Sequence, residues 1–459
     1  MSQARFMIAA PASGSGKTLI TCGLMHLLKR RGLRVQSFKC GPDFIDPMFH
    51  AYITGRPAGN LDAFMAEPDV IRRMLQDGMR DADITLTEGV MGFFDGIGFG
   101  DTKASSADAA LRTGTPVILV MNGRGVSTST LPLIQGMLSF PGGEMINGII
   151  LNRISKGVFP PMKQMIESAL PVKVIGYLPE LPDVRLDSRH LGLMMPSEIE
   201  DLEMQLNRLA DCLEDTVSLE GLLTIAKEAE VLCEDETAAF TTAADCPEGF
   251  RVRIGVAKDE AFCFFYQENL RMLERAGAEP VYFSPLHDEH LPEDLDALLL
   301  VGGYPELKAQ ELSANKSMRT EIADACKGGM PVLAECGGFL YLHRTLEDLE
   351  GKAWPMCGVI HAAAYNNHRL TRFGYITLQG GMFFGQDIGH VRAHEFHHYD
   401  SEDPGNAFLA VKPAGKRRWN CIHSSETMYA GFPHLYYPAN PEIVTAYIAA
   451  AQRYHRRKS

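Results

Sequence analysis

The chain has 459 residues, of which 46% are hydrophobic and 22% charged, a composition typical of a soluble protein with two or three domains. Its formal net charge of −13 argues against a nucleic-acid partner, since binding to phosphate backbones needs clustered positive charge. No apolar run approaches the roughly 20 residues that span a bilayer, and the N-terminus lacks the pattern of a signal peptide, so we expect a cytoplasmic protein with no membrane partner. The cysteines form no Cys-x-x-Cys pair, so we expect reduced thiols and no structural zinc.

From the start to about residue 195, short apolar runs rich in β-formers alternate with helix-like stretches. Each run is long enough for a buried parallel strand. The runs are Arg5–Ala10, Arg34–Phe38, Ile84–Thr87, Val117–Met121, Gly148–Leu151 and Val172–Tyr177. This alternation predicts a doubly wound α/β domain with a parallel sheet.

A glycine-rich turn lies between the first run and an apolar helix-like stretch. It contains Gly14, Ser15, Gly16, Lys17 and Thr18. Such a turn directs backbone N–H groups and the helix dipole at phosphate oxygens, while the lysine adds a positive charge and the threonine hydroxyl can ligate magnesium. We therefore predict a P-loop that binds ATP and Mg²⁺, although Pro11 stands where the standard motif has its first glycine.

Acidic residues follow several of these strands at the same edge of the predicted sheet. Glu88 comes directly after the third run and is the main candidate for a magnesium ligand. Asp43, a second candidate ligand, and Asp46, a candidate for the substrate site, follow the second run, although aspartate also favours turns for structural reasons. Asp95 is another loop acid that we assign to the substrate site. An anionic substrate would also need a basic pocket, for which the candidates are Lys39, Arg185, Arg189 and His190.

Residues from about 200 to 250 pass from an acidic helical pattern into a small, polar stretch that offers little to pack, which predicts a linker. A second α/β pattern follows, ending in a helix that begins near Asn440 and Pro441. Its expected elements are strands at Val252–Ala257, Val281–Phe283, Ala297–Val301 and Pro331–Ala334 and a helix through Leu270–Ala276. We therefore divide the chain into a nucleotide-binding domain (1–200), a helical segment and linker (201–248) and a second α/β domain (249–459).

The last of these strands runs into Cys336 and two glycines, followed by the helix-compatible stretch 339–346. A cysteine at a tight strand-to-helix turn gains thiolate character from the helix N-terminus, and the glycines leave room for a substrate. We therefore expect Cys336 to be an exposed nucleophile. The backbone N–H groups of Gly337 and of Gly303, in a loop after another strand, are the candidates for an oxyanion hole.

A thiol nucleophile needs a base, and two histidines of the second domain are candidates. His434 is the first choice and His423 the alternative. Further histidines lie within the segment 394–398, which satisfies the zinc-protease pattern His-Glu-x-x-His. That chemistry requires a helix, whereas the surrounding residues predict a strand ending in a turn, so we expect no zinc site there.

In these motifs and their order the chain resembles the cobyrinate and hydrogenobyrinate a,c-diamide synthases of vitamin B12 biosynthesis. The resemblance covers nearly the whole chain and includes APASGSGKT at 10–18, FKCGPDFIDPMFH at 38–50, EGVMGFFDG at 88–96, VGGYPEL at 301–307, AECGGFLYL at 334–342 and HLYYPANPE at 434–442. It implies a P-loop domain of the dethiobiotin-synthetase type followed by a class I glutamine amidotransferase domain of the cobyric-acid-synthase type. It also implies ATP- and glutamine-dependent amidation of the a and c acetate groups of a corrin ring.

The resemblance also implies roles for individual residues. Cys336 and His434 match the family's nucleophile and base, which favours His434 over His423. The acids that match the synthetase site are Asp43, Asp46, Glu88 and Asp95. The usual His-x-Glu ending of class I amidotransferases is absent, because Tyr436 stands two residues after His434, so the group that orients the histidine is left open.

The sequence leaves two other functions open. A similar a,c-diamide synthase could amidate another tetrapyrrole, such as nickel-sirohydrochlorin, and the motifs do not separate these substrates. A partitioning-type ATPase switch could use the first domain alone, but the appended cysteine domain argues against it. In each enzymatic interpretation the binding partners are small molecules. The sequence leaves the oligomeric state open, and a homodimer is one possibility.

Overall fold

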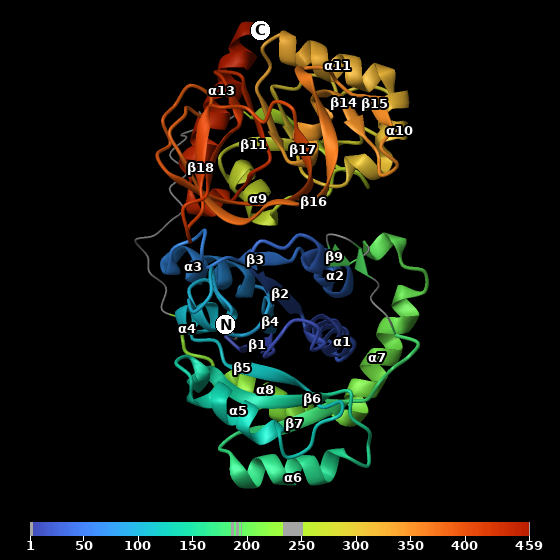
Figure 1. Ribbon diagram of the computed structural model, residues 1–459, viewed down its shortest axis with the longest axis vertical. Coiled ribbons are helices and arrows are strands. Elements are labelled where there is room, and N and C mark those ends of the chain that lie inside the picture. Colours follow the sequence, from blue (N-terminus) through green and yellow to red (C-terminus); the bar gives the residue numbers. More distant parts are fainter. Residues whose placement is uncertain (1–2, 185–187, 190–191, 194, 233–250, 459) are drawn as a thin grey trace. The chain divides into compact units, whose positions relative to one another are not determined.

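The computed structural model describes residues 3–184, 188–189, 192–193, 195–232 and 251–458. The chain forms two compact units, Met1–Thr237 and Ala238–Ser459 (Figure 1). No helix in these described ranges is long and apolar enough to cross a membrane.

The first unit is built on a wholly parallel seven-stranded sheet with the order β3-β2-β4-β1-β5-β6-β7. Its strands are β1 Arg5–Ala9, β2 Val35–Cys40, β3 Gly59–Leu61, β4 Ile84–Glu88, β5 Val117–Asn122, β6 Ile146–Asn152 and β7 Lys173–Leu178. The strands are buried along almost their whole length, as expected for a parallel sheet covered on both faces. The predicted α/β fold is confirmed, and the three-residue strand β3 is the one that the apolar runs did not indicate.

Eight helices of the described residues accompany this sheet. They are α1 Lys17–Arg30, α2 Ile45–Thr54, α3 Pro68–Met79, α4 Ser106–Thr113, α5 Thr130–Ser139, α6 Phe159–Ala169, α7 Leu202–Thr216 and α8 Leu219–Lys227. Short 3₁₀ turns occupy Gly143–Met145 and Pro196–Glu198.

Helix α7 comes from the acidic segment after residue 200 and packs on α1 within the first unit. Its buried stripe includes Leu209 and Leu213, spaced as one face of a helix requires. The contact is close because α1 presents Gly23, where an added Cβ would lie 2.4 Å from Leu213 Cδ1 and 2.6 Å from Leu209 Cγ. The polar stretch 235–249, on which the predicted linker rests, lies outside the described residues.

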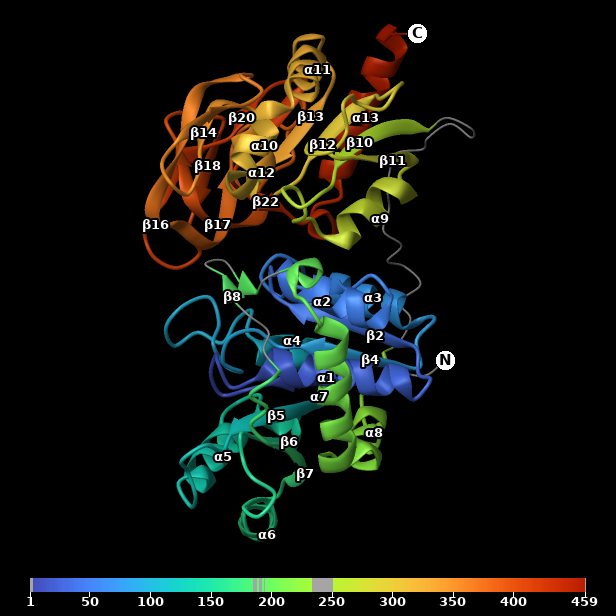
Figure 2. The ribbon, with the colours of Figure 1, turned by 90° about the vertical axis from the view of Figure 1, so that its right-hand side faces the viewer.

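The second unit contains two sheets (Figure 2). The first has the order β11-β10-β12-β13-β21-β20 and is parallel from β11 to β21. Its strands are β10 Val252–Ala257, β11 Ala278–Phe283, β12 Ala297–Leu300, β13 Val332–Glu335, β20 His423–Ser424 and β21 Met428–Gly431. All four strands predicted for this unit are confirmed. The helices are α9 Gln267–Arg275, α10 Ala309–Ala314, α11 Lys316–Lys327, α12 Gly337–Tyr341 and α13 Glu442–Lys458.

The second sheet of this unit follows the order β15-β14-β16-β17-β22, and β18 pairs with β16 while β19 pairs with β18. Its strands are β14 His343–Glu347, β15 Ala353–Pro355, β16 Ile360–Gln379, β17 Val391–Ser401, β18 Phe408–Val411, β19 Arg418–Cys421 and β22 His434–Leu435. The segment with the His-Glu-x-x-His pattern lies in β17, so its prediction as a strand is confirmed.

The prediction of helix over 339–346 is wrong beyond Tyr341, where α12 ends. The chain continues as β14, which pairs with β16. His343 contributes to this change, because its buried ring bonds Ser401 Oγ of β17 at 2.6 Å and the Phe339 carbonyl at 2.9 Å. A long-range sheet contact thus overrides the local helix pattern.

We predict that Leu209→Ala destabilises the first unit by about 2–4 kcal/mol, because it empties a buried position against α1. Urea unfolding combined with hydrogen exchange of the α1 amides measures this loss. The matched control is Met204→Ala on the same helix, where the side chain is 63% exposed and the expected change is under about 0.5 kcal/mol. Equal effects of the two substitutions would show that α7 adds nothing to this core.

Candidate active sites

The glycine-rich turn of the first unit leads directly into α1, which begins at Lys17. Gly14 and Gly16 have φ of 77° and 96°, in the left-handed region that glycine tolerates best. Gly16 also lies against the end of β6, where an added Cβ would be 2.1 Å from Asn152 Nδ2. The same Asn152 nitrogen donates to the Ser15 carbonyl at 2.8 Å, which fixes the turn on the sheet edge.

Glu88 is the centre of a buried polar cluster beside this turn. Thr18 Oγ1 donates to Glu88 Oε1 at 2.6 Å, and Lys39 Nζ lies 3.0 Å from the same oxygen. Lys39 Nζ also lies 2.5 Å from Asp46 Oδ2, while His50 Nε2 is 2.9 Å from Glu88 Oε2. The parallel pairing of β2 with β4 sets Lys39 opposite Glu88. The predicted residues Thr18, Glu88 and Asp46 are therefore brought together, with Lys39 between the two carboxylates.

The ionisation of this cluster follows from its pairing. Burial opposes the charge on Lys39, but Asp46 and Glu88 outweigh it and raise its pKa well above the ordinary value. Burial likewise opposes the charge on Glu88, but Lys39 and hydrogen bonds from His50 and Thr18 hold its pKa well below the ordinary value. Burial, together with the nearby Lys39, lowers the pKa of Lys17. Glu88 is thus an anion at neutral pH.

The donor set around Glu88 fits magnesium, which prefers carboxylate and hydroxyl oxygens. Within the described residues, no three His, Cys, Asp or Glu side chains gather as a metal-binding group. In nucleotide enzymes one or two protein ligands of Mg²⁺ are usually completed by waters and substrate phosphates.

Two of the predicted acids hold backbone in place. Asp43 Oδ1 accepts from the N–H groups of Ile45 and Asp46 at 2.8 and 3.1 Å at the start of α2, which is the turn role weighed from the sequence. Asp95 Oδ2 accepts from the Gly92 N–H at 2.9 Å in the loop after β4. Among the basic candidates only Lys39 belongs to the residues whose side chains are described.

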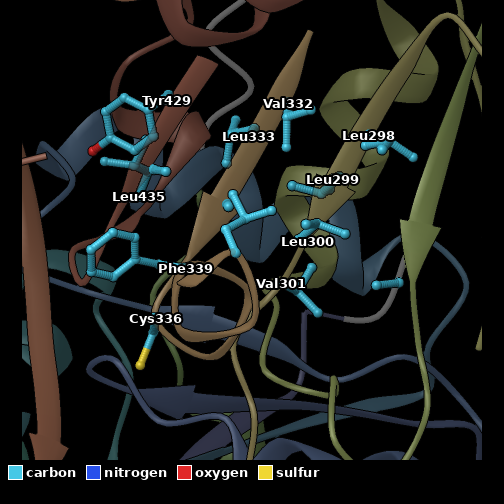
Figure 3. Packing of buried hydrophobic residues seen from close by; sticks show 14 of the residues in the cluster. Leu298, Leu299, Leu300, Val301, Val332, Leu333, Cys336, Phe339, Tyr429 and Leu435 are labelled. Carbon is cyan, nitrogen blue, oxygen red and sulfur yellow. The ribbon is translucent and has the colours of Figure 1, made fainter. Parts of the chain in front are cut away.

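The second candidate site is the turn at Cys336, between β13 and α12. Cys336 has φ 46° and ψ −101°, a strained conformation typical of a nucleophile at a sharp strand-to-helix turn. Its N–H donates to the Gly431 carbonyl at 2.8 Å, which ties the turn to the end of β21. Figure 3 shows the sulfur pointing away from the hydrophobic side chains of β12 and β13.

Two sequence-based expectations about Cys336 are wrong. The residue is only 6% exposed, because the turn is enclosed by neighbouring loops. Burial raises the pKa of the Cys336 thiol, and the nearby carboxylates of Glu306 and Glu395 raise it further. These effects outweigh the opposing hydrogen bond from the Gly337 backbone, so the thiol is protonated at rest and needs a base.

His434 is the first residue of the short strand β22. A Cβ at Gly302 would be 2.6 Å from His434 Cε1, and a Cβ at Gly337 would be 3.2 Å from the Gly302 carbonyl carbon. Glycine at both positions therefore allows the histidine and the two loops to approach each other. The rival His423 instead bonds the Asp403 carbonyl at 2.9 Å. The geometry favours His434 as the base.

Gly303 and Gly337 lie next to each other at the nucleophile turn. A Cβ on Gly337 would be 2.8 Å from the Gly303 nitrogen, while one on Gly303 would be 2.1 Å from the Ala261 carbonyl. The Tyr304 N–H donates to that carbonyl at 2.9 Å, so the loop is fixed in place. Two backbone N–H groups close to the nucleophile can stabilise a developing oxyanion.

The surroundings of the histidines in β17 indicate a structural role and not a zinc site. Along a strand, His394 and His398 are separated by roughly 13 Å, too far apart to share one zinc ion. His397 stacks on Phe432 with ring centroids 3.9 Å apart, and its Nε2 lies 3.3 Å from Glu395 Oε2.

Comparison with known proteins covers both units. Residues 6–193 match the model of the CobQ/CobB/MinD/ParA nucleotide binding domain, and residues 253–440 match that of the CobB/CobQ-like glutamine amidotransferase domain. The chain is 38% identical over 457 residues to the cobyrinate a,c-diamide synthase of Listeria monocytogenes serotype 4b, covering 98% of this chain and 100% of the relative. It is 37% identical over 455 residues to the Salmonella typhimurium enzyme of the same name, covering 98% of both chains.

We predict that Gly302→Ala lowers glutamine hydrolysis by about 10- to 100-fold, because the added methyl group forces His434 away from the turn. Glutamate release measures this effect. The control is Gly136→Ala, where an added Cβ meets nothing within 4 Å and hydrolysis should be unchanged. A fully active Gly302→Ala protein would contradict the assignment of His434 to this site.

Proposed function

Because the chain belongs to the cobyrinate a,c-diamide synthase family, we propose that it amidates the a and c acetate carboxylates of cobyrinate or hydrogenobyrinate at the expense of ATP and glutamine. It is a ligase with a nucleotide-binding domain and a glutamine amidotransferase domain. The observation that carries the proposed substrate is the similarity to named cobyrinate a,c-diamide synthases over 98% of the chain.

The first unit activates the carboxylate, since a carboxylate is a poor acylating agent. In our proposal an acetate oxygen of the substrate attacks the γ-phosphorus of ATP, the bond to the β-γ bridging oxygen breaks, and an acyl phosphate and ADP result. The P-loop N–H groups and Lys17 hold the phosphates during this step. Magnesium, when bound, neutralises phosphate charge, and Thr18, Glu88 and Asp43 are the proposed residues that hold it.

The substrate carboxylates need positive charge at the same edge of the sheet. Lys39 is buried there between Asp46 and Glu88 and keeps its charge at neutral pH. We place Asp46 and Asp95 at this substrate side of the site as well.

The second unit supplies nitrogen from glutamine. In our proposal the Cys336 sulfur attacks the side-chain amide carbon while the thiol proton passes to His434. The N–H groups of Gly303 and Gly337 stabilise the oxyanion. His434 then protonates the departing nitrogen, the C–N bond breaks, and ammonia leaves behind a thioester. Water, deprotonated by His434, hydrolyses the thioester to glutamate and restores the thiol.

The two half-reactions meet when ammonia attacks the acyl phosphate and displaces phosphate. Ammonia needs to remain unprotonated for this attack, which favours its direct use over release as ammonium. The partitioning-type ATPase alternative leaves the cysteine site without a role, so the glutaminase arrangement around Cys336 supports the ligase instead.

We predict that Cys336→Ser lowers glutamine-dependent amidation of cobyrinate by roughly 10³-fold or more, because the hydroxyl is a much weaker nucleophile in this environment. Amidation with ammonium as nitrogen donor should be retained, since the first unit is unchanged. Mass spectrometry of the product counts the amides formed. Loss of both activities in a folded protein, or ammonium-dependent amidation without ATP consumption, would contradict the division of the reaction between two sites.

The choice of tetrapyrrole gives a separate prediction. We expect kcat/KM for cobyrinate to exceed that for nickel-sirohydrochlorin by at least about tenfold, because a site complementary to the corrin ring binds its transition state better. Both acids are assayed with the same nitrogen donor and ATP. The reverse ratio would assign the chain to the nickel tetrapyrrole.

A further inference from the structure

The base His434 needs a group that fixes its orientation, and the usual carboxylate is missing. Two residues after His434 stands Tyr436, which is fully buried and packs edge-on against Tyr266 with ring centroids 5.1 Å apart. A tyrosine held in this packing supplies no negative charge. The orienting group therefore has to come from another part of the unit.

A carboxylate faces His434 from the residue directly before the nucleophile. Glu335 is the last residue of β13, and its Oε2 lies 3.5 Å from His434 Nδ1. Both side chains are almost completely buried, at 8% and 2% exposure. The distance is longer than a resting hydrogen bond, and catalytic hydrogen bonds in unliganded enzymes commonly shorten when substrate binds.

The second oxygen of Glu335 is held by the backbone next to the histidine. Leu435 N–H donates to Glu335 Oε1 at 3.4 Å. Leu435 and His434 form the short strand β22, which pairs with β17. One carboxylate thus links the end of β13, which carries the nucleophile, to the strand that carries the base.

Two other neighbours of His434 among the described residues, His394 and Gly302, carry no negative charge. His394 stands directly opposite it on β17, and burial lowers the pKa of His394, so that ring is neutral. The backbone of Gly302 lies against the Cε1 edge of the His434 ring. Burial raises the pKa of Glu335, and the contact with His434 opposes that rise.

We propose that Glu335 is the positioning residue of the glutaminase site, accepting the Nδ1 proton of His434 in a hydrogen bond so that Nε2 faces the Cys336 thiol. When sulfur attacks the amide carbon, the thiol proton moves to Nε2 and an imidazolium forms. The carboxylate stabilises this cation until Nε2 passes the proton to the departing nitrogen. Nucleophile and positioning residue are then consecutive in the chain.

This inference rests on the proposed glutaminase function, and Glu335→Gln tests it. Glutamine keeps the volume and the oxygen that accepts from Leu435 but lacks the charge. We expect kcat for glutamine hydrolysis to fall by about 10²-fold with KM for glutamine little changed, because the lost interaction is made mainly after proton transfer. Ammonium-dependent amidation should stay at the wild-type level. A merely structural role predicts wild-type hydrolysis in Glu335→Gln.

The matched control is Asp296→Asn. Asp296 is another buried carboxylate of this unit in contact with a histidine, His455 Nδ1 at 2.9 Å, but it precedes β12 at the opposite end of the strand from the nucleophile. This substitution should leave hydrolysis unchanged. Equal losses in both variants, or an unaffected Glu335→Gln protein, would overturn the inference. Absence of hydrolysis in the wild-type protein would instead contradict the proposed function.

A second measurement covers the case in which Glu335→Gln does not fold. In wild-type protein labelled with ¹⁵N-histidine, the signals of His434 are assigned by their loss in His434→Gln. A proton on Nδ1 of the neutral ring supports the contact with Glu335. A proton on Nε2 with Nδ1 bare overturns it.

Discussion

The candidate site of the second unit depends on the close approach of two backbone turns, one after β12 and one after β13. Gly302 and Gly303 follow one strand, and Gly337 and Gly338 follow the nucleophile on the other. A Cβ at Gly338 would lie 2.1 Å from the Leu300 carbonyl, so side chains at these positions would separate the two turns. Because the turns touch, the two N–H groups, the proposed base His434 and the Cys336 thiol come together at one sheet edge. The strain at Cys336 is maintained by the same contacts.

In the first unit the arrangement of the site depends on an electrostatic constraint instead of a close approach of backbone turns. Neighbouring parallel strands end with Lys39 and Glu88 opposite each other, and the P-loop helix adds Thr18 to the same carboxylate. A buried carboxylate without such partners would be protonated. The register of β2 on β4 therefore keeps Glu88 ionised, which its proposed role as a magnesium ligand requires.

The sequence predicts the parts of both sites that depend on local pattern. The strands, the P-loop and the glycine-flanked cysteine each have a signature within about ten residues. The features it misses depend on contacts between distant segments. The pairing of Lys39 with Glu88 needs the strand register, β14 needs its partner β16, and the burial of Cys336 results from loops far along the chain. Glu335 is next to the nucleophile in sequence, but only the position of β22 reveals that it faces His434.

The two sites handle buried charge in different ways. In the first unit the charges of Lys39 and Glu88 are present at rest and stabilise each other. In the second unit burial keeps the Cys336 thiol neutral, and in the proposed mechanism charge separates only when its proton moves to His434. Since burial penalises an isolated charge, the thiolate forms together with the imidazolium that balances it.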